Sequence, residues 1–167
     1  MKVIYHCFGG SHSSVTAAAI HLGILTETQR PTITSLLEIP YYDGQISSDH
    51  GIIRFMGKDV HGNQVYILGR RNSNIVTQNC LNGIAQLFGI TPDELLLVDV
   101  MPYVNWMMMV GGYLSRRMGW VRIGRPIVVM GTIISFPKMV GLVQRIRLQV
   151  ASKGRPVVDW PEQDYDY

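Results

Sequence analysis

Cysteine is scarce in this chain: two residues, Cys7 and Cys80, occur among 167, and no C-x-x-C pair is present. Two cysteines are too few for a disulfide scaffold, and the missing pair removes the usual zinc motif. None of the five histidines stands at a convincing metal-ligand spacing from another histidine. We therefore expect no metal site, and nothing in the composition indicates a bound cofactor.

Long hydrophobic runs are also missing. The longest apolar stretches, residues 98–110 and 127–136, fall short of the roughly 20 residues that span a bilayer. The first residues read as a strand and carry no signal-peptide pattern. We expect a cytoplasmic protein with no membrane span. Because 47% of the residues are hydrophobic and 16% are charged, the composition predicts a globular domain and excludes disorder.

Acidic residues are few outside the C-terminal tail. Four of the 12 lie in the final stretch DWPEQDYDY, so the rest of the chain carries a basic excess. An electropositive face attracts phosphates, which predicts a phosphate-bearing small molecule or a nucleotide as a partner. Nucleic acid is disfavoured, because no helix-turn-helix, zinc-finger or stacked-aromatic motif accompanies the charge. We expect one α/β domain over residues 1–153 and an acidic, aromatic tail over residues 154–167.

Apolar runs and helical periodicity alternate along the chain. Continuous apolar segments predict buried strands, and a 3.6-residue period predicts helices. The expected strands are residues 1–7, 95–100 and 126–130, and the expected helices are residues 14–25, 74–88, 105–118 and 136–150. Residues 52–56 and 64–68 form an expected hairpin joined by GKDVHGN. This order predicts an α/β three-layer sandwich with a mostly parallel sheet and an edge β-hairpin.

Two of the expected helices carry residues assigned to packing. Cys80 shares one side of the helix at residues 74–88 with Val76, Ile84 and Leu87, which predicts a small core residue. In the helix at residues 105–118, a run of Trp and Met precedes two glycines. Large flexible side chains beside glycines favour dense helix packing over a partner interface or a hydrophobic pocket.

The stretch YHCFGGSHSSV, residues 5–15, places a thiol, glycines and hydroxyls between the first strand and its helix. Gly9 and Gly10 let the backbone adopt a positive φ and let an anion approach the amides. The helix N-terminus adds positive potential, and the serines add hydroxyl donors. The pattern predicts an anion-binding loop in which Ser11, Ser13 and Ser14 add hydroxyl donors to the backbone amides of residues 8–14. A tight turn capped by serine and holding no ligand is the alternative.

Several chemically active side chains follow other expected strands. Ligands of parallel α/β sheets bind beyond the carboxyl ends of the strands, where Asp99 and Thr132 are expected. Arg70 and Arg71 follow the hairpin and are the best candidate arginines for an anion.

Cys7 is the first candidate for a catalytic residue within the loop. A helix N-terminus favours its nucleophilic thiolate, while burial as a small apolar residue is the equal alternative. His12 and Asp99 are the candidates for proton transfer.

The loop resembles three known phosphate-binding motifs. His6, Cys7, Gly10 and Ser14 match the H-C-x5-R-[ST] loop of tyrosine phosphatases, with Ser13 in place of the arginine. The loop of the IIB components of sugar phosphotransferase systems, which lacks that arginine, is similar in its cysteine, glycine and final serine. FGGSHSS also resembles a P-loop, with Ser13 in place of the lysine and LLLVD resembling Walker B. The first two resemblances imply a cysteine that attacks or carries a phosphoryl group, and the third implies a degenerate nucleotide site.

Across the whole chain, three motifs resemble an uncharacterised bacterial family of domains of unknown function, found in short proteins of spore-forming bacteria. They are YHCFGGSHSS, GKDVHGNQVYILGRR and GRPIVVMGT. This resemblance implies a compact domain and a bacterial cytoplasmic setting, and it implies no chemistry.

Three hypotheses for function follow. The first is a phosphate- or anion-binding protein with cysteine-dependent phosphoryl transfer or hydrolysis at residues 7–14. The second is a non-catalytic nucleotide-binding or regulatory module with a degenerate P-loop. The third is an interaction protein, with a protein partner or a second copy of itself, whose glycine loop is only a turn. Whether the protein is an enzyme stays open at this point.

Overall fold

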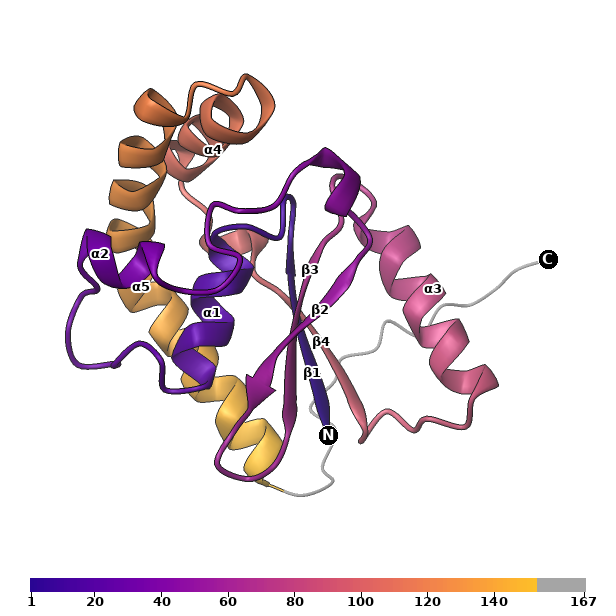
Figure 1. Cartoon of the computed structure of the whole chain (residues 1–167). Coiled ribbons are helices and arrows are strands. Elements are labelled where there is room, and N and C mark those ends of the chain that lie inside the picture. Colours follow the sequence, from indigo (N-terminus) through magenta and orange to yellow (C-terminus); the bar gives the residue numbers. More distant parts are fainter. Residues whose placement is uncertain (153–167) are drawn as a thin grey trace.

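The computed structural model describes residues 1–152, and the expected C-terminal tail lies outside the described residues (Figure 1). Its strands are β1 (Lys2–Cys7), β2 (Ile53–Lys58), β3 (Gln64–Gly69) and β4 (Leu95–Asp99). Its helices are α1 (Ser13–His21), α2 (Ile33–Leu37), α3 (Asn74–Leu87), α4 (Trp106–Gly112) and α5 (Val121–Ala151). Short 3-10 turns, η1 (Ser47–Asp49) and η2 (Met101–Tyr103), and a π-helical turn, η3 (Tyr113–Arg117), complete the described part.

The strands form one four-stranded sheet in the order β2-β3-β1-β4. β1 runs parallel to both β3 and β4, with Val3 beside Val65 and Leu96. β2 runs antiparallel to β3 and lies at the edge, as the hairpin prediction requires. The sheet is therefore mixed, and the α/β class predicted from the sequence is confirmed at that level.

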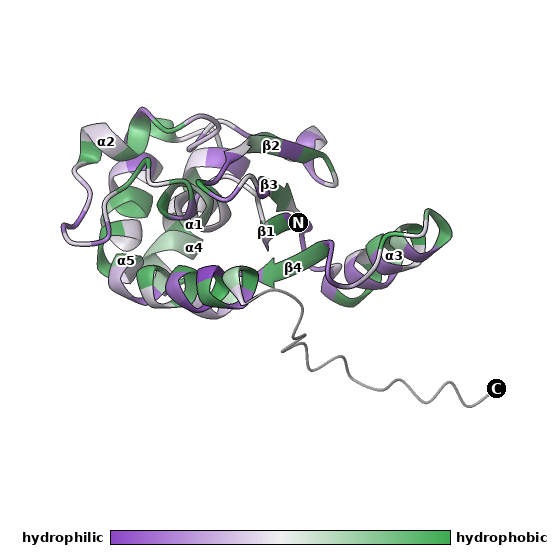
Figure 2. Cartoon of the chain, turned by 90° about the horizontal axis from the view of Figure 1, so that it is seen from below, coloured by the Kyte–Doolittle hydropathy of each residue, from purple (hydrophilic) through white to green (hydrophobic). Residues whose placement is uncertain are grey.

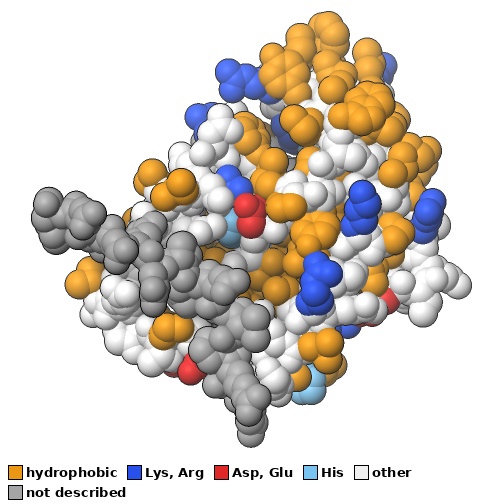
Figure 3. Space-filling model, turned by 180° about the vertical axis from the view of Figure 1, so that it is seen from behind, with side chains coloured by type: hydrophobic (Ala, Val, Ile, Leu, Met, Phe, Trp, Pro, Cys, Tyr) orange, Lys and Arg blue, Asp and Glu red, His pale blue; other side chains and the backbone are white. Residues whose placement is uncertain are grey.

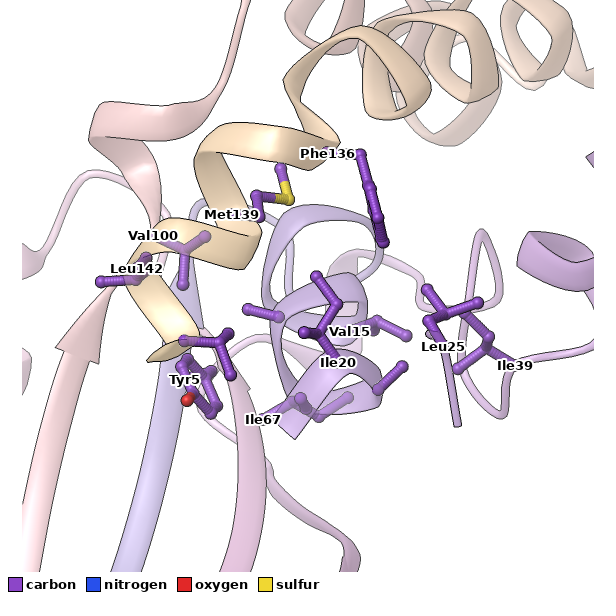
Figure 4. Packing of buried hydrophobic residues seen from close by; sticks show 14 of the residues in the cluster. Tyr5, Val15, Ile20, Leu25, Ile39, Ile67, Val100, Phe136, Met139 and Leu142 are labelled. Carbon is purple, nitrogen blue, oxygen red and sulfur yellow. The ribbon is translucent and has the colours of Figure 1, made fainter. Parts of the chain in front are cut away.

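One face of the sheet carries the hydrophobic core. α1 packs against β1 and β3, and α5 packs against α1 on the same side of the sheet (Figures 1 and 2). Tyr5 from β1, Ile20 from α1 and Met139 from α5 are fully buried and lie close together in this layer (Figure 4). Alternate residues of the strands point into this layer, because successive side chains of a strand face opposite sides.

The opposite face is covered sparsely. α3 lies there (Figure 2), and Ala85 is its one buried residue. Cys80 is exposed, and Leu87 is 85% exposed, so the prediction that Cys80 is a core residue is wrong. The 3.6-residue spacing correctly indicated a helix with an apolar stripe, but the stripe faces solvent instead of the sheet. The expected three-layer sandwich is not confirmed for this reason.

α5 is one helix of 31 residues, so the predicted strand at residues 126–130 is wrong. Val128 and Val129 suggested a strand because β-branched residues favour sheets, but both pack inward here from a helix. The helix contains Pro126 and Pro137 and continues through both. By length and composition α5 could cross a membrane, although more than half of its most apolar stretch is buried inside the protein, as in the core helix of a soluble domain.

Glycines bring α4 and α5 into backbone contact. A Cβ atom on Gly111 would lie 2.4 Å from the backbone N of Val128, and one on Gly124 would lie 2.3 Å from the backbone N of Ser115. Only glycine permits this approach at either position. The expected dense packing is therefore found at the glycines, but not along the whole Trp and Met run, because Trp106 is 70% and Met109 61% exposed.

Candidate functional site

The loop between β1 and α1 folds tightly over the end of β3. Gly10 has a φ of +69°, and a Cβ atom there would lie 2.7 Å from the backbone N of Gly69. The Gly10 N–H donates to the Cys7 Sγ at 3.1 Å, and the Cys7 thiol donates to the Ser14 Oγ at 3.2 Å. Cys7 is 4% exposed. The loop therefore holds the sulfur between a backbone donor and a hydroxyl at the start of α1.

Most N–H groups of this loop have no acceptor among the described residues. Within residues 1–152, the backbone N–H groups of Ser11, His12, Ser13 and Ser14 donate to no protein acceptor. The loop is nevertheless held in place, because the Asp43 N–H donates to the Ser11 carbonyl at 3.0 Å and the Gln45 N–H donates to the Ser11 hydroxyl at 3.1 Å. Unpaired donors at a helix N-terminus suit an anion.

A cavity of about 520 Å³ lies beside the loop. Cys7, Gly9, Ser11, His12 and Ser13 line one side of it. An apolar wall on another side comes from η2, α4 and the residues next to them; it comprises Met101, Val104, Met108, Met109 and Tyr113. The cavity is also lined by basic residues, which are His50, Arg71, Arg116 and Arg117. Sequence reasoning anticipated the loop side and Arg71, but it missed the two arginines of η3.

Two of these arginines have guanidinium groups without a partner. Among residues 1–152, the side chains of Arg71 and Arg117 make no ion pair or hydrogen bond, whereas Arg116 pairs with Asp43 at 2.9 Å. Arg71 also has a φ of +52°, a left-handed conformation that is uncommon outside glycine. Strained backbone of this kind gathers at functional sites.

A buried carboxylate, Asp43, joins the loop to the helices behind it. Asp43 is 3% exposed and contacts four side chains: His12 Nε2 at 3.1 Å, Ser115 Oγ at 2.9 Å, Arg116 Nε at 2.9 Å and Arg125 Nε at 2.7 Å. Burial alone would raise the pKa of Asp43, but the hydrogen bonds from His12 and Arg125 outweigh it and hold that pKa well below its usual range. Asp43 is therefore ionised, and it orients the His12 ring at the cavity wall.

Sequence reasoning missed Asp43. In the sequence it lies within an irregular polar segment, YYDGQISSDH, that resembles an ordinary loop. Its partners are 31, 72 and 82 positions away for His12, Ser115 and Arg125. No local pattern signals a contact at such separations.

Arg70 and Asp99 belong to a different cluster, which is centred on His6. The Arg70 Nε donates to His6 Nδ1 at 3.0 Å, and its Nη2 donates to both Asp99 carboxylate oxygens at 3.1 and 3.0 Å. His6 and Cys7 are neighbours in β1, so their side chains point to opposite faces of the sheet. Burial lowers the pKa of His6 to about 4. Neither Arg70 nor Asp99 lines the cavity.

Thr132 lies in the core of the helical layer. Its hydroxyl donates to the Val128 carbonyl at 2.9 Å and accepts from the Tyr42 hydroxyl at 2.8 Å. It was expected at the end of a strand, but residues 126–130 are helical, so Thr132 lies inside α5 and does not line the cavity. The described residues also contain no cluster of three His, Cys, Asp or Glu side chains able to hold a metal ion.

The fold and the cavity define an α/β protein with a glycine-rich loop beside an arginine-lined pocket. The chain belongs to the DUF3189 family, described as a protein of unknown function, whose model matches residues 2–148. The predicted membership of a family of domains of unknown function is therefore confirmed, and the three motifs that suggested it all fall within the matched range. No curated protein and no solved structure matches the chain.

Proposed function

We propose that the protein binds a phosphate-bearing ligand, or a similar anion, in the cavity beside the loop from Cys7 to Ser14. The observation that carries this proposal is the meeting of two unpaired guanidinium groups with a loop of free N–H donors around one cavity. Buried N–H donors without an acceptor are costly, and a bound anion satisfies those of the loop. Arg71 and Arg117 are exposed and add positive charge at the cavity. The cationic side chains Arg71 and Arg117 have no carboxylate partner within residues 1–152.

The distribution of polar and apolar lining suggests how the ligand lies. Its anionic group fits the loop, where backbone donors and the positive end of α1 stabilise negative charge. Arg71 and Arg117 then bind outer oxygens, because a guanidinium group matches a phosphate in bidentate geometry. The uncharged remainder of the ligand fits against the apolar wall that Met108 and Met109 help to form.

Binding of inorganic phosphate is the direct test. Titration calorimetry is expected to show saturable binding by the wild-type chain, and Arg71→Gln or Arg117→Gln is expected to weaken it about tenfold, because each removes a charge-assisted contact. Ligand binding also raises the melting temperature by mass action, which gives a second measurement.

Arg122→Gln is the matched control, since Arg122 is an exposed arginine that does not line this cavity. It is expected to leave phosphate binding unchanged. Wild-type protein that shows no saturable phosphate binding, or binding that is equally weakened by Arg122→Gln, would contradict the proposal.

A second candidate function is cysteine-dependent phosphoryl transfer. It is favoured by the position of the Cys7 sulfur at the cavity wall, next to the Gly10 N–H and the Ser14 hydroxyl. Both groups can donate to a thiolate. His12 lines the same cavity and is oriented by Asp43, which is the arrangement of a proton donor held by a carboxylate. The arginine that tyrosine phosphatases carry inside the loop would be replaced by Arg71 or Arg117 from outside it.

In this reaction the Cys7 thiolate attacks the phosphorus of a phosphate monoester. A sulfur–phosphorus bond forms, the ester oxygen–phosphorus bond breaks, and the leaving oxygen takes the proton of the His12 imidazolium. Water then attacks the phosphocysteine and gives a proton to His12, and the sulfur–phosphorus bond breaks to release inorganic phosphate. The N–H donors of the loop stabilise the negative charge of both transition states.

Cys7→Ser separates catalysis from binding. In a Cys80→Ser background, iodoacetamide alkylation of Cys7 is expected to slow when phosphate or vanadate is present, and p-nitrophenyl phosphate turnover is expected to fall at least about a hundredfold in Cys7→Ser. Phosphate affinity in Cys7→Ser is expected to stay within about twofold, because the N–H donors remain. Retained phosphate binding without any wild-type turnover would instead support the non-catalytic binding module.

A further inference from the structure

α4 and α5 share a hydrophobic face that no other described part of the chain covers. We call it the outer α4–α5 face and define it by Trp106 and Val110 of α4 and by Ile123, Ile127, Met130 and Ile134 of α5. Trp106 is 70% exposed, Ile123 56% and Ile134 51%. Figure 3 shows hydrophobic side chains gathered toward the upper end of the molecule, with lysine and arginine side chains around them.

The six residues lie on one side of the pair of helices. Trp106 and Val110 are one helical turn apart, and the α5 residues recur at intervals of three or four, so each set forms a stripe. On α4, Met108 and Gly111 face α5, and Met109 and Gly112 lie toward the cavity or His12. The α4 stripe occupies the remaining side.

The contacts also fix how the two stripes are related. Gly131 of α5 approaches Met108, while Gly124 approaches Ser115, so the helices run antiparallel. On α5, Val129, Phe136 and Met139 point into the core. The cavity side of α4 and the core side of α5 point in the same general direction. The sides opposite to them therefore also point in a common direction, away from the protein. The stripes therefore form one continuous apolar surface, larger than single exposed hydrophobic residues would give.

The charged residues that α4, α5 and the segment between them supply have a single sign. From residue 101 to residue 152 the sequence contains no Asp or Glu. Arg122 and Lys138 flank the face and, among residues 1–152, have no ion pair or hydrogen bond. A second copy of the chain would bring a like-charged rim against this one, which costs free energy. A partner surface with negative charge is the complementary one.

We propose that the outer α4–α5 face binds the surface of a membrane that contains anionic lipids. Tryptophan and aliphatic side chains enter the boundary between headgroups and acyl chains, while arginine and lysine stay with the phosphates. α5 lies on the membrane in this arrangement and does not cross it, because its other side is committed to the protein core through residues such as Phe136 and Met139. Each basic side chain near an anionic surface adds to the attraction.

Co-sedimentation with lipid vesicles tests the proposal on the full chain. Binding is expected to vesicles of phosphatidylcholine and phosphatidylglycerol in equal parts, with little binding to phosphatidylcholine alone. Tryptophan emission is expected to shift to shorter wavelength on binding, measured in a Trp160→Phe background so that the signal comes from Trp106 and Trp120. Added salt is expected to weaken the binding, since the charge term is screened.

Variants identify the surface that binds. Met130→Gln with Ile134→Gln is expected to lower the partition coefficient about tenfold or more, because two apolar side chains no longer enter the lipid. Arg122→Glu with Lys138→Glu is expected to abolish the preference for anionic vesicles. The matched control is Val60→Gln with Ile75→Gln, two residues that are 94% and 67% exposed on the β2–β3 turn and on α3. This control is expected to bind like wild type.

Several outcomes would overturn the proposal. One is the absence of vesicle binding by the wild-type chain. Another is a dimer in analytical ultracentrifugation that Met130→Gln with Ile134→Gln dissociates while vesicles bind neither protein, which would assign the face to a second copy. Equal binding to neutral and anionic vesicles would remove the role of the basic rim. The proposal is independent of phosphate binding in the cavity, so a vesicle result does not decide that question.

Discussion

Gly10→Ala is expected to lower the free energy of unfolding by about 3 kcal/mol, since it combines two costs. Gly10 has a φ of +69°, which is unfavourable for any residue with a Cβ atom. The added carbon would also lie 2.7 Å from the backbone N of Gly69 and 2.9 Å from its Cα. Both neighbours are backbone atoms of β3, so the loop has to shift. Urea unfolding at constant m-value measures the change.

Gly9→Ala is the control for this prediction. A Cβ atom on Gly9 would have no neighbour within 4 Å, so its cost is expected to stay within about 0.5 kcal/mol. The comparison separates the steric requirement at residue 10 from a general need for flexibility in the loop. Phosphate binding is expected to be lost in Gly10→Ala, because the N–H donors move with the loop. Equal stability of the two variants would contradict the tight loop geometry.

Asp43→Asn is expected to lower the free energy of unfolding by about 3 to 5 kcal/mol, the range for removing one partner of a buried ionic network. The variant leaves Arg116 and Arg125 without a negative partner and replaces one of the two acceptor oxygens of Asp43 with an NH2 donor. Asp49→Asn is the matched control, because Asp49 also pairs with an arginine, Arg54, but near the surface. Its cost is expected to be below about 1 kcal/mol.

The same carboxylate makes the stability depend on pH. The folded-state pKa of Asp43 lies below its unfolded value, so the unfolded chain takes up a proton first as the pH falls. The stabilisation is fully present above about pH 4, the ordinary value for aspartate, and is lost progressively as the pH falls below it. Asp43→Asn is expected to show a weaker fall in stability over this acidic range. An unchanged acid dependence would mean that Asp43 is not the ionised centre of the network.

Local features of the site could be predicted from the sequence. A strand, a glycine turn and a helix follow one another around Cys7. Each depends on residues that are neighbours in the sequence, so the type of each element could be predicted. The same holds for the hairpin, because its turn chemistry and alternating pattern lie within one short segment. His6 lies on the opposite side of the strand from Cys7, as the alternation of side chains along a strand requires, and there it contacts Arg70.

Features that depend on distant contacts could not be predicted. Asp43 has a role only because Ser115 and Arg125 fold back over it. Residues 126–130 have a strand-like composition but are helical, and the glycines on either side of them, Gly124 and Gly131, pack closely against residues 105–115, far away in the sequence. α3 shows the opposite case, since a periodic apolar stripe indicated burial and the sheet does not supply a surface for it. Thr132 was misplaced as a consequence of the error in α5.

The cavity has walls from two halves of the chain, with the loop from Cys7 to Ser14 on one side and the α4–η3 segment on the other. Asp43 holds these walls together through His12 and Arg116. Any ligand that contacts both walls must therefore oppose the separation of the α4–η3 segment from the loop. Docking of that segment against the loop must in turn strengthen ligand binding, because the coupling free energy is the same in both directions. Amide hydrogen exchange in α4 would then slow when the cavity is filled, even at peptide groups that the ligand does not touch.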